Sequence, residues 1–243
     1  ELMLKFLKYP IKIKKNINRE TISLKGLNQF RSFEYYVPGD ISSASFFIVL
    51  TILSNNSKMI IKSVNINESR IGIIKILNMM GAGIQFKNKK FYNGEKIADI
   101  YIKSKKNLKS VDCPSSLNSS AIDEFLIIFL VAAKSKGISK FKNLGEMNKK
   151  ESKRLDLAVK FLKLIGIKVE RIKNDIKIHG NPKLSLLGSY EIKNFLKDHR
   201  IFFLSCITAL TLGGEWKIND KDSINTSFPS FLKILKMLGA KIN

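Results

Sequence analysis

Charged and hydroxyl side chains gather at three places in this sequence, each next to the expected start of a helix. They are Asp40, Ser42 and Ser43 with 67–72, then Asp123 and Glu146 with 149–154, and finally 198–200 with 225–229. The N-terminus of a helix favours anions, because its backbone N–H groups are free and its dipole is positive there. These residues could therefore bind an anionic ligand and transfer protons.

The second group has the most informative spacing. Lys150 lies four residues before Arg154, and Glu151 lies three residues before it. A helix over this stretch would place the three side chains on one face at its N-terminal end. An arginine there could bind a carboxylate or phosphate through two parallel hydrogen bonds. A neighbouring carboxylate could then transfer protons.

The same plan occurs three times along the chain, which indicates internal repetition. Each copy contains an almost wholly apolar run, expected to form a helix in the middle of a core, at 46–53, 125–133 and 201–212. Each copy closes on a glycine that follows an apolar stripe of helical spacing: Gly81, Gly166 and Gly239. Glycine suits the left-handed residue that ends a helix. We therefore predict one α/β domain of helix–strand–helix–strand units.

Each polar group also has a simpler structural interpretation. The stretch 149–154 could be a solvated helix start, and Asp123 could be a helix cap. Arg200 could form a surface pair with Asp198, which would contribute little. The repeat favours a site, because equivalent positions in stacked units point toward one end of the domain. We therefore expect the three groups to converge.

Composition narrows the class of protein. The chain has 243 residues and 44% hydrophobic content, which is enough for a real core. No apolar run approaches the ~20 residues of a membrane helix, and the N-terminus does not resemble a signal peptide, so we expect a cytoplasmic protein. Two cysteines (Cys113, Cys206) and two histidines (His179, His199) are too few for a disulfide framework or a metal site.

The net charge of +23, from 43 basic and 20 acidic residues, makes nucleic acid a possible partner. The lysines are spread through loops without regular aromatic neighbours, however, which favours a biased coding composition and weak, non-specific attraction. A basic nucleic-acid-binding module stays open as an alternative. Lysines clustered on a face away from the polar groups would support it. Convergence of Asp123, Lys150, Glu151, Arg154 and Arg200 at one end would count against it.

Six motifs carry a resemblance to a known family. In chain order they are V-P-G-D-I-S-S-A-S (37–45), N-E-S-R-I-G (67–72), A-I-D-E-F (121–125), K-K-E-S-K-R (149–154), K-D-H-R-I (197–201) and N-T-S-F-P-S-F (225–231). In order and spacing they resemble the C-terminal half of the 5-enolpyruvylshikimate-3-phosphate synthases, the 3-phosphoshikimate 1-carboxyvinyltransferases. The resemblance covers nearly the whole chain.

The resemblance implies an enolpyruvyl transferase-like inverse α/β fold, with three βαβαββ-type repeats in each domain of a two-domain enzyme. Residues 1–37 would be a remnant of the N-terminal domain and the crossover, and 38–243 the C-terminal domain. Glu1 stands where a methionine is usual, and 2–7 has the pattern of a helix already under way. We therefore interpret the chain as a fragment whose partner is the N-terminal domain of the same polypeptide, a monomer when complete.

The family transfers the enolpyruvyl group of phosphoenolpyruvate to the 5-hydroxyl of shikimate 3-phosphate, in aromatic amino-acid biosynthesis and without a cofactor or metal. By motif match, Asp123 would contact the shikimate hydroxyls and accept a proton, and Glu151 would donate a proton toward the phosphoenolpyruvate methylene. Lys150 would bind shikimate 3-phosphate, while Arg154 and Arg200 would bind phosphoenolpyruvate. The resemblance implies no specific nucleic acid and no membrane as partners.

Three positions depart from the family pattern. Asn148 and Lys153 replace a usual arginine and aspartate, and Thr226 stands where some branches have a phosphoenolpyruvate-binding lysine and others a threonine. The related UDP-N-acetylglucosamine enolpyruvyl transferases share the fold and are the alternative enzyme. They would be expected to show a motif set different from K-E-S-x-x-R with D-H-R, so we rank them lower.

Overall fold

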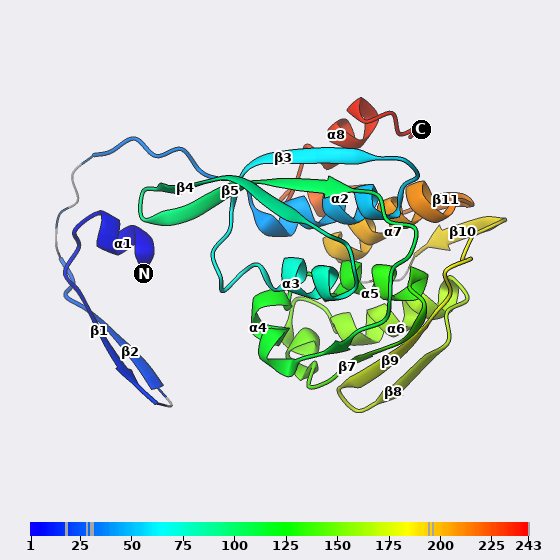
Figure 1. Cartoon of the computed structure of the whole chain (residues 1–243), viewed down its shortest axis with the longest axis horizontal. Helices are drawn as coiled ribbons and strands as arrows, with labels where there is room; N and C mark the ends of the chain where they lie inside the picture. Colours follow the sequence, from blue (N-terminus) through cyan, green and yellow to red (C-terminus); the bar gives the residue numbers. More distant parts are fainter. Residues whose placement is uncertain (18, 28, 30–31, 194, 196, 243) are drawn as a thin grey trace.

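Three helices made almost wholly of apolar residues lie at the centre of the structure: α2 (Ile41–Leu53), α5 (Phe125–Lys134) and α7 (His199–Leu212). The structure is a computed structural model that describes residues 1–17, 19–27, 29, 32–193, 195 and 197–242. The three helices contact one another pairwise (Figure 1), and most of their side chains are buried. A helix that is apolar on all sides gains most when other elements surround it. The predicted central helices are therefore confirmed.

Strands and further helices surround these three. The first unit continues with β3 (Lys58–Asn65), α3 (Gly72–Met79), β4 (Gln85–Tyr92) and β5 (Glu95–Lys103). The second comprises β6 (Asp112–Cys113), α4 (Asn118–Ala121), α5, β7 (Gly137–Phe141), α6 (Arg154–Leu164), β8 (Val169–Ile172) and β9 (Asp175–Gly180). The third comprises β10 (Ser189–Ile192), α7, β11 (Glu215–Ile218) and α8 (Phe231–Met237). Short 3₁₀ turns occupy Ser115–Leu117, Gly145–Lys149 and Lys221–Ile224.

Strand pairing follows the repeat. Segments on either side of each central helix pair in parallel: Gly39 with Val64, β6 with β7, and β10 with β11. In the first two units a hairpin adds antiparallel strands, giving the sheets β3-β5-β4 and β6-β7-β9-β8. Gly81, Gly166 and Gly239 have φ of +89°, +77° and +96° and follow α3, α6 and α8. These positive values confirm the predicted helix-ending glycines.

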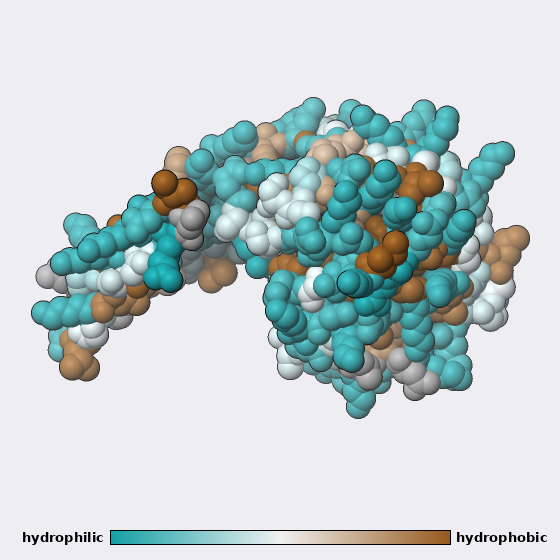
Figure 2. All heavy atoms as spheres, turned by 90° about the horizontal axis from the view of Figure 1, so that it is seen from below, coloured by the Kyte–Doolittle hydropathy of each residue, from teal (hydrophilic) through white to brown (hydrophobic). Residues whose placement is uncertain are grey.

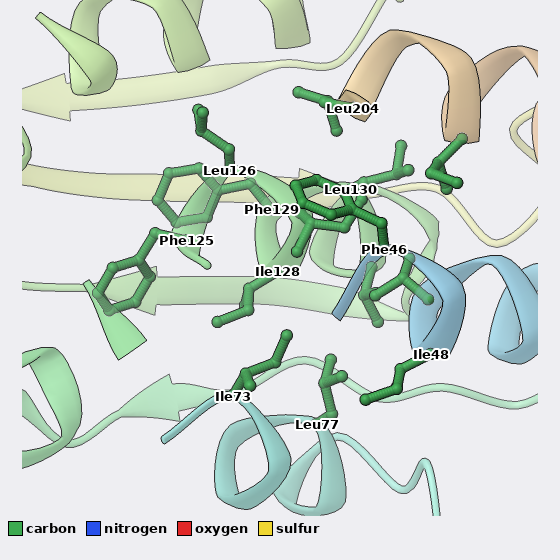
Figure 3. Packing of buried hydrophobic residues seen from close by; sticks show 14 of the residues in the cluster. Phe46, Ile48, Ile73, Leu77, Phe125, Leu126, Ile128, Phe129, Leu130 and Leu204 are labelled. Carbon is green, nitrogen blue, oxygen red and sulfur yellow. The ribbon is translucent and has the colours of Figure 1, made fainter. Parts of the chain in front are cut away.

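The central core extends from α5 to its neighbours. Figure 3 shows Phe125, Phe129 and Leu130 of α5 between the side chains of α2, α3 and α7. The rings of Phe125 and Phe129 lie 5.8 Å apart at their centroids, and both contact Phe141 of β7. This packing fixes the position of the α5 N-terminus, where the polar residues of the second unit gather.

Residues 1–37 lie to one side of these units and contain α1 (Leu2–Phe6) and the antiparallel pair β1 (Ile11–Asn16) and β2 (Arg19–Leu24) (Figure 1). The segment is tied to the β4–β5 turn, where the backbone N–H of Tyr36 donates to the Tyr92 hydroxyl at 2.9 Å. Figure 2 shows this projection, with apolar side chains scattered among hydrophilic ones. The division into 1–37 and 38–243 remains a prediction.

Among the described residues, no helix combines the length and the apolar character that a membrane crossing requires.

The structure corrects one local expectation. Lys150 and Glu151 are not helical, because α6 begins only at Arg154 and 150–153 form an irregular segment before it. Pro229 lies in a turn two residues before α8. The register of β3 against β5 shifts between Ile61 and Val64, as at a β-bulge.

Candidate active site

Asp123 is the centre of the polar cluster. It lies in the turn between α4 and α5. The residue directly before α5 is Glu124, whose side chain makes no hydrogen bond that caps the helix. Asp40 and Asp198, by contrast, cap α2 and α7 through backbone N–H groups. The extra helical turn of α4 thus separates Asp123 from a capping role. Its carboxylate faces basic side chains from other parts of the chain, so the helix-cap interpretation is wrong.

Basic side chains from the first two units surround the Asp123 carboxylate. Its Oδ1 lies 3.2 Å from Lys150 Nζ and 3.4 Å from Arg154 Nη1. Its Oδ2 lies 3.7 Å from Arg70 Nη1. The third unit contributes Arg200, whose Nη1 donates to the Asp123 backbone carbonyl oxygen at 2.7 Å.

Arg154 is the most enclosed of the basic groups, with 3% of its side chain exposed. Its guanidinium faces three carboxylates: Nε donates to Asp198 Oδ2 at 3.1 Å, Nη1 faces Asp123, and Nη2 pairs with Glu151 Oε2 at 2.5 Å. Asp198 is 1% exposed, whereas Glu151 is 72% exposed. Asp198 is therefore fixed by burial, Asp123 is partly buried at 17% exposure, and Glu151 can move into solvent.

The structure thus brings all five predicted site residues together in one contact network: Asp123, Lys150, Glu151, Arg154 and Arg200. They come from the second and third units, and Arg70 adds the first. This convergence counts against a nucleic-acid-binding module. The convergence does not depend on a helix over 149–154, because the irregular segment before α6 brings Lys150 and Glu151 to the α5 N-terminus.

Opposing effects set the pKa of the two aspartates. Burial raises the pKa of the Asp123 carboxyl, but Arg200, Lys150 and Arg154 together outweigh burial and hold it below its usual range. Burial also raises the pKa of the Asp198 carboxyl. The hydrogen bond from Ser152 and the positive charge of Arg154 outweigh burial and hold this pKa below its usual range. Both carboxylates are therefore ionised at neutral pH, as a proton acceptor must be.

Glu124 behaves differently although it is next in sequence to Asp123. It is 2% exposed, and burial raises its pKa despite the opposing hydrogen bond from Ser42 and the charge of Arg200. Ser42 Oγ donates to Glu124 Oε1 at 2.5 Å and accepts from Arg70 Nη2 at 2.9 Å. Arg200 Nη1 lies 3.9 Å from the same Glu124 oxygen.

Five members of the cluster received no individual role from the sequence: Ser42, Arg70, Glu124, Ser152 and Asp198. All of them except Glu124 belonged to the three polar groups that the sequence singled out. Arg70 offered the clearest signal, since it precedes the second helix of its unit much as Arg154 begins that of the next. The other four are common types at helix ends, and their sequence positions do not distinguish a site from a cap.

The substitution at Asn148 has a structural explanation. Its Oδ1 accepts from the Leu155 backbone N–H at 2.9 Å, and its Nδ2 donates to Asp156 at 3.1 Å. It therefore stabilises the first turn of α6 from outside the helix. Nothing in the structure explains Lys153 or Thr226. In the described part of the chain, no three His, Cys, Asp or Glu side chains are arranged to hold a metal ion.

Comparisons with known proteins agree with this geometry. The family model for EPSP synthase (3-phosphoshikimate 1-carboxyvinyltransferase) matches residues 1–235. A protein of that name from Ruthia magnifica subsp. Calyptogena magnifica is 36% identical over 100% of this chain and 54% of its own length. One from Thermodesulfovibrio yellowstonii is 35% identical over 91% of this chain and 51% of its own. The chain spans about half the length of the curated relatives it matches.

Solved structures show the same fold. An EPSP synthase from Acinetobacter baumannii superposes with a TM-score of 0.88 at 32% identity, covering 99% of this chain and 54% of that protein. The enolpyruvyl transferase NikO from Streptomyces tendae has a TM-score of 0.67 at 13% identity, which shows likeness of fold alone. The predicted inverse α/β repeat fold is confirmed, and the chain belongs to the EPSP synthase (3-phosphoshikimate 1-carboxyvinyltransferase) family.

Proposed function

We propose that this chain supplies the C-terminal part of a 3-phosphoshikimate 1-carboxyvinyltransferase active site. The enzyme would transfer the enolpyruvyl group of phosphoenolpyruvate to the 5-hydroxyl of shikimate 3-phosphate in aromatic amino-acid biosynthesis. The observation that carries the proposal is the convergence of Lys150, Arg154 and Arg200 on the ionised Asp123. Both substrates are anions, and arginine and lysine bind such groups through charge-assisted hydrogen bonds.

The proposed roles are those that the family resemblance implies, and the contacts around Asp123 support them. Asp123 would accept the proton of the 5-hydroxyl while the hydroxyl oxygen forms a bond to C2 of phosphoenolpyruvate, and Glu151 would donate a proton to C3. The product of this step is a tetrahedral adduct. In the second step, Glu151 would take a proton back from C3 as the bond between C2 and the phosphate oxygen breaks, which restores the double bond. The departing phosphate would carry away the proton held by Asp123. Asp123 is ionised because its basic neighbours lower its pKa, so it can take the proton only once ligand anions offset their charge.

Glu151 and Arg154 suggest how phosphoenolpyruvate enters. Nη2 of Arg154 pairs with the exposed carboxylate of Glu151, whereas Nη1 and Nε face the partly buried Asp123 and the buried Asp198. A substrate carboxylate can replace Glu151 at Nη2 without disturbing Asp198. Glu151 would then face the substrate rather than the arginine, which is where a proton donor is needed. Lys150, 30% exposed, would bind shikimate 3-phosphate from its side of Asp123.

The test is phosphate release from the two substrates, measured with this chain alone and with the N-terminal half of the Ruthia magnifica relative added as a second polypeptide. We expect no turnover from the chain alone, because catalysis needs both substrates in one geometry, and turnover when the second half is present. An Arg200→Ala chain is the matched control and should stay inactive in both mixtures. No turnover in the complemented mixture, with both halves folded and associated, would contradict the proposal.

The remaining partners follow from the same proposal. The chain would work with an N-terminal domain of the same polypeptide, in a monomer located in the cytoplasm. The same assay tests the alternative enzyme when UDP-N-acetylglucosamine replaces shikimate 3-phosphate. Turnover only with UDP-N-acetylglucosamine as the acceptor would favour that alternative.

A further inference from the structure

We propose that Glu124 is a positioning residue that holds Arg200 directly, and Arg70 through Ser42, on two sides of Asp123. The inference rests on the proposed function for its kinetic consequences, but its structural part stands on the contacts of Glu124 alone. Like Asp123, Glu124 is a residue at which the three units of the repeat meet. Ser42 comes from the first unit, Glu124 from the second and Arg200 from the third.

The direction of the hydrogen bonds makes Glu124 Oε1 an acceptor. Arg70 can only donate, so Ser42 Oγ accepts from it at 2.9 Å. The Ser42 hydroxyl hydrogen is then directed at Glu124 Oε1, 2.5 Å away. A proton on that oxygen would leave the Ser42 hydrogen without this acceptor. The Arg200 guanidinium, 3.9 Å from the same oxygen, favours negative charge there.

Arg200 depends on Glu124 because its own contacts are few. Its side chain is 13% exposed, and its Nε is buried without a hydrogen-bond partner among the described residues. Nη1 donates to the Asp123 carbonyl oxygen at 2.7 Å and lies 3.9 Å from Glu124 Oε1. The Glu124 charge therefore keeps the guanidinium against the turn that carries Asp123.

The arrangement gives Asp123 a basic neighbour on each side. Arg70 Nη1 lies 3.7 Å from the Asp123 carboxylate, and Arg200 Nη1 binds the backbone carbonyl of the same residue. Both guanidiniums connect to Glu124, which touches neither substrate in our proposal. Burial of an ionised carboxylate is unfavourable unless cations and donors compensate it. The compensation here comes from the groups that Glu124 positions.

The direct test uses NMR of the arginine Nε–H groups in this chain, with the Arg200 signal assigned by its loss in Arg200→Lys. Glu124→Gln keeps the shape of the side chain and removes its charge. We expect exchange of the Arg200 Nε hydrogen with water to become at least about tenfold faster, because the guanidinium is no longer held. The matched control is Glu170→Gln, which neutralises a carboxylate paired with His179 on β8 and β9 and should leave the Arg200 signal unchanged.

The kinetic test uses the complemented enzyme. Glu124→Gln should raise the KM for phosphoenolpyruvate about tenfold, equal to about 1.4 kcal/mol, with the KM for shikimate 3-phosphate within about threefold. A purely structural role for Glu124 would lower the fraction of folded protein. That loss reduces apparent turnover and leaves both KM values unchanged.

Ser42→Ala keeps the test decisive if Glu124→Gln does not fold, since it removes only the hydroxyl that fixes Glu124. It should accelerate Arg200 Nε exchange by a smaller factor, and its matched control is Ser135→Ala, a buried hydroxyl at the other end of α5. An Arg200 signal unchanged in Ser42→Ala and in any folded Glu124→Gln would overturn the inference. If Arg200 Nε exchange changes in these variants but the complemented parent enzyme shows no turnover, the proposed function is refuted. The positioning role of Glu124 then still stands.

Discussion

Arg154 and Asp198 form the most deeply buried ion pair of the cluster, and breaking it should be costly. Arg154→Met keeps much of the side-chain volume but leaves the Asp198 charge, 1% exposed, without its guanidinium partner. Ser152 and the two backbone N–H groups at the start of α7 remain. Removal of one partner from a buried pair destabilises a protein by about 3–5 kcal/mol. We expect a loss of this size in the free energy of unfolding.

A double-mutant cycle with Asp198→Asn tests the cause. Asparagine is still a good helix cap, so this change mainly removes the buried charge. The double variant Arg154→Met, Asp198→Asn has no unpaired buried charge at position 198 and should be at least about 1 kcal/mol more stable than the sum of the single losses predicts. Urea unfolding at neutral pH gives each value. Losses that add within about 0.5 kcal/mol would refute the reasoning. Arg171→Met, which removes the more exposed pair with Asp156, is the control and should cost at most about 1 kcal/mol.

Three further predictions concern chemistry, pH and nucleic acid. In the complemented enzyme, Asp123→Asn should lower turnover by ~10²–10⁴-fold, because an amide cannot accept the proton, and turnover equal to the parent would assign the proton acceptor elsewhere. The pKa of Asp198 is lowered in the folded protein, so its contribution to stability is present above its unfolded pKa, near 3.8, and is lost as the pH falls through the folded value. Acid unfolding below about pH 4 should therefore be less steep in Asp198→Asn than in the parent. Binding of a labelled single strand should be weak and disappear at physiological salt, whereas sequence-selective binding that survives would contradict this.

The repeat was readable from sequence because its signals are local. A run such as 46–53 is apolar at every position except Thr51, which is typical of a helix surrounded by other elements. Gly81, Gly166 and Gly239 follow periodic stripes, and their positive φ agrees with the role that their type predicts. Asp40 accepts from the backbone N–H groups of Ser42 and Ser43, as a cap should. Each of these features depends on a few neighbouring residues.

The irregular segment before α6 was not readable, because tertiary contacts override local propensity there. The lysines and glutamate of 149–154 are good helix formers, and their spacing suits a helix face. Arg154, however, binds Asp123 and Asp198, which lie far away in sequence. Asn148 caps the helix from outside at Leu155, so α6 starts later than its composition suggests. Only the folded chain reveals this competition.

Asp123 and Glu124 mark a second limit of sequence analysis. They are adjacent carboxylates at the start of an apolar run, and the sequence does not say which one faces the basic groups. The structure leaves Asp123 17% exposed among Lys150 and Arg154 and buries Glu124 at 2% beside Ser42. Their pKa values accordingly move in opposite directions. Packing of the α5 N-terminus, rather than residue type, assigns the difference.

The charges of the cluster constrain how an anion can bind. Among the described residues, four basic groups contact four carboxylates: Arg70, Lys150, Arg154 and Arg200 with Asp123, Glu124, Glu151 and Asp198. The cluster is therefore balanced, so an anionic ligand must displace a carboxylate or cause one to take up a proton. Glu151 is the mostly exposed one, and its ion pair is with Arg154. It is therefore the carboxylate that a ligand anion can displace with the least rearrangement. A ligand anion at Arg154 would free the Glu151 side chain to face the substrate. The substrate itself would then release the residue that the proposed reaction needs as its proton donor.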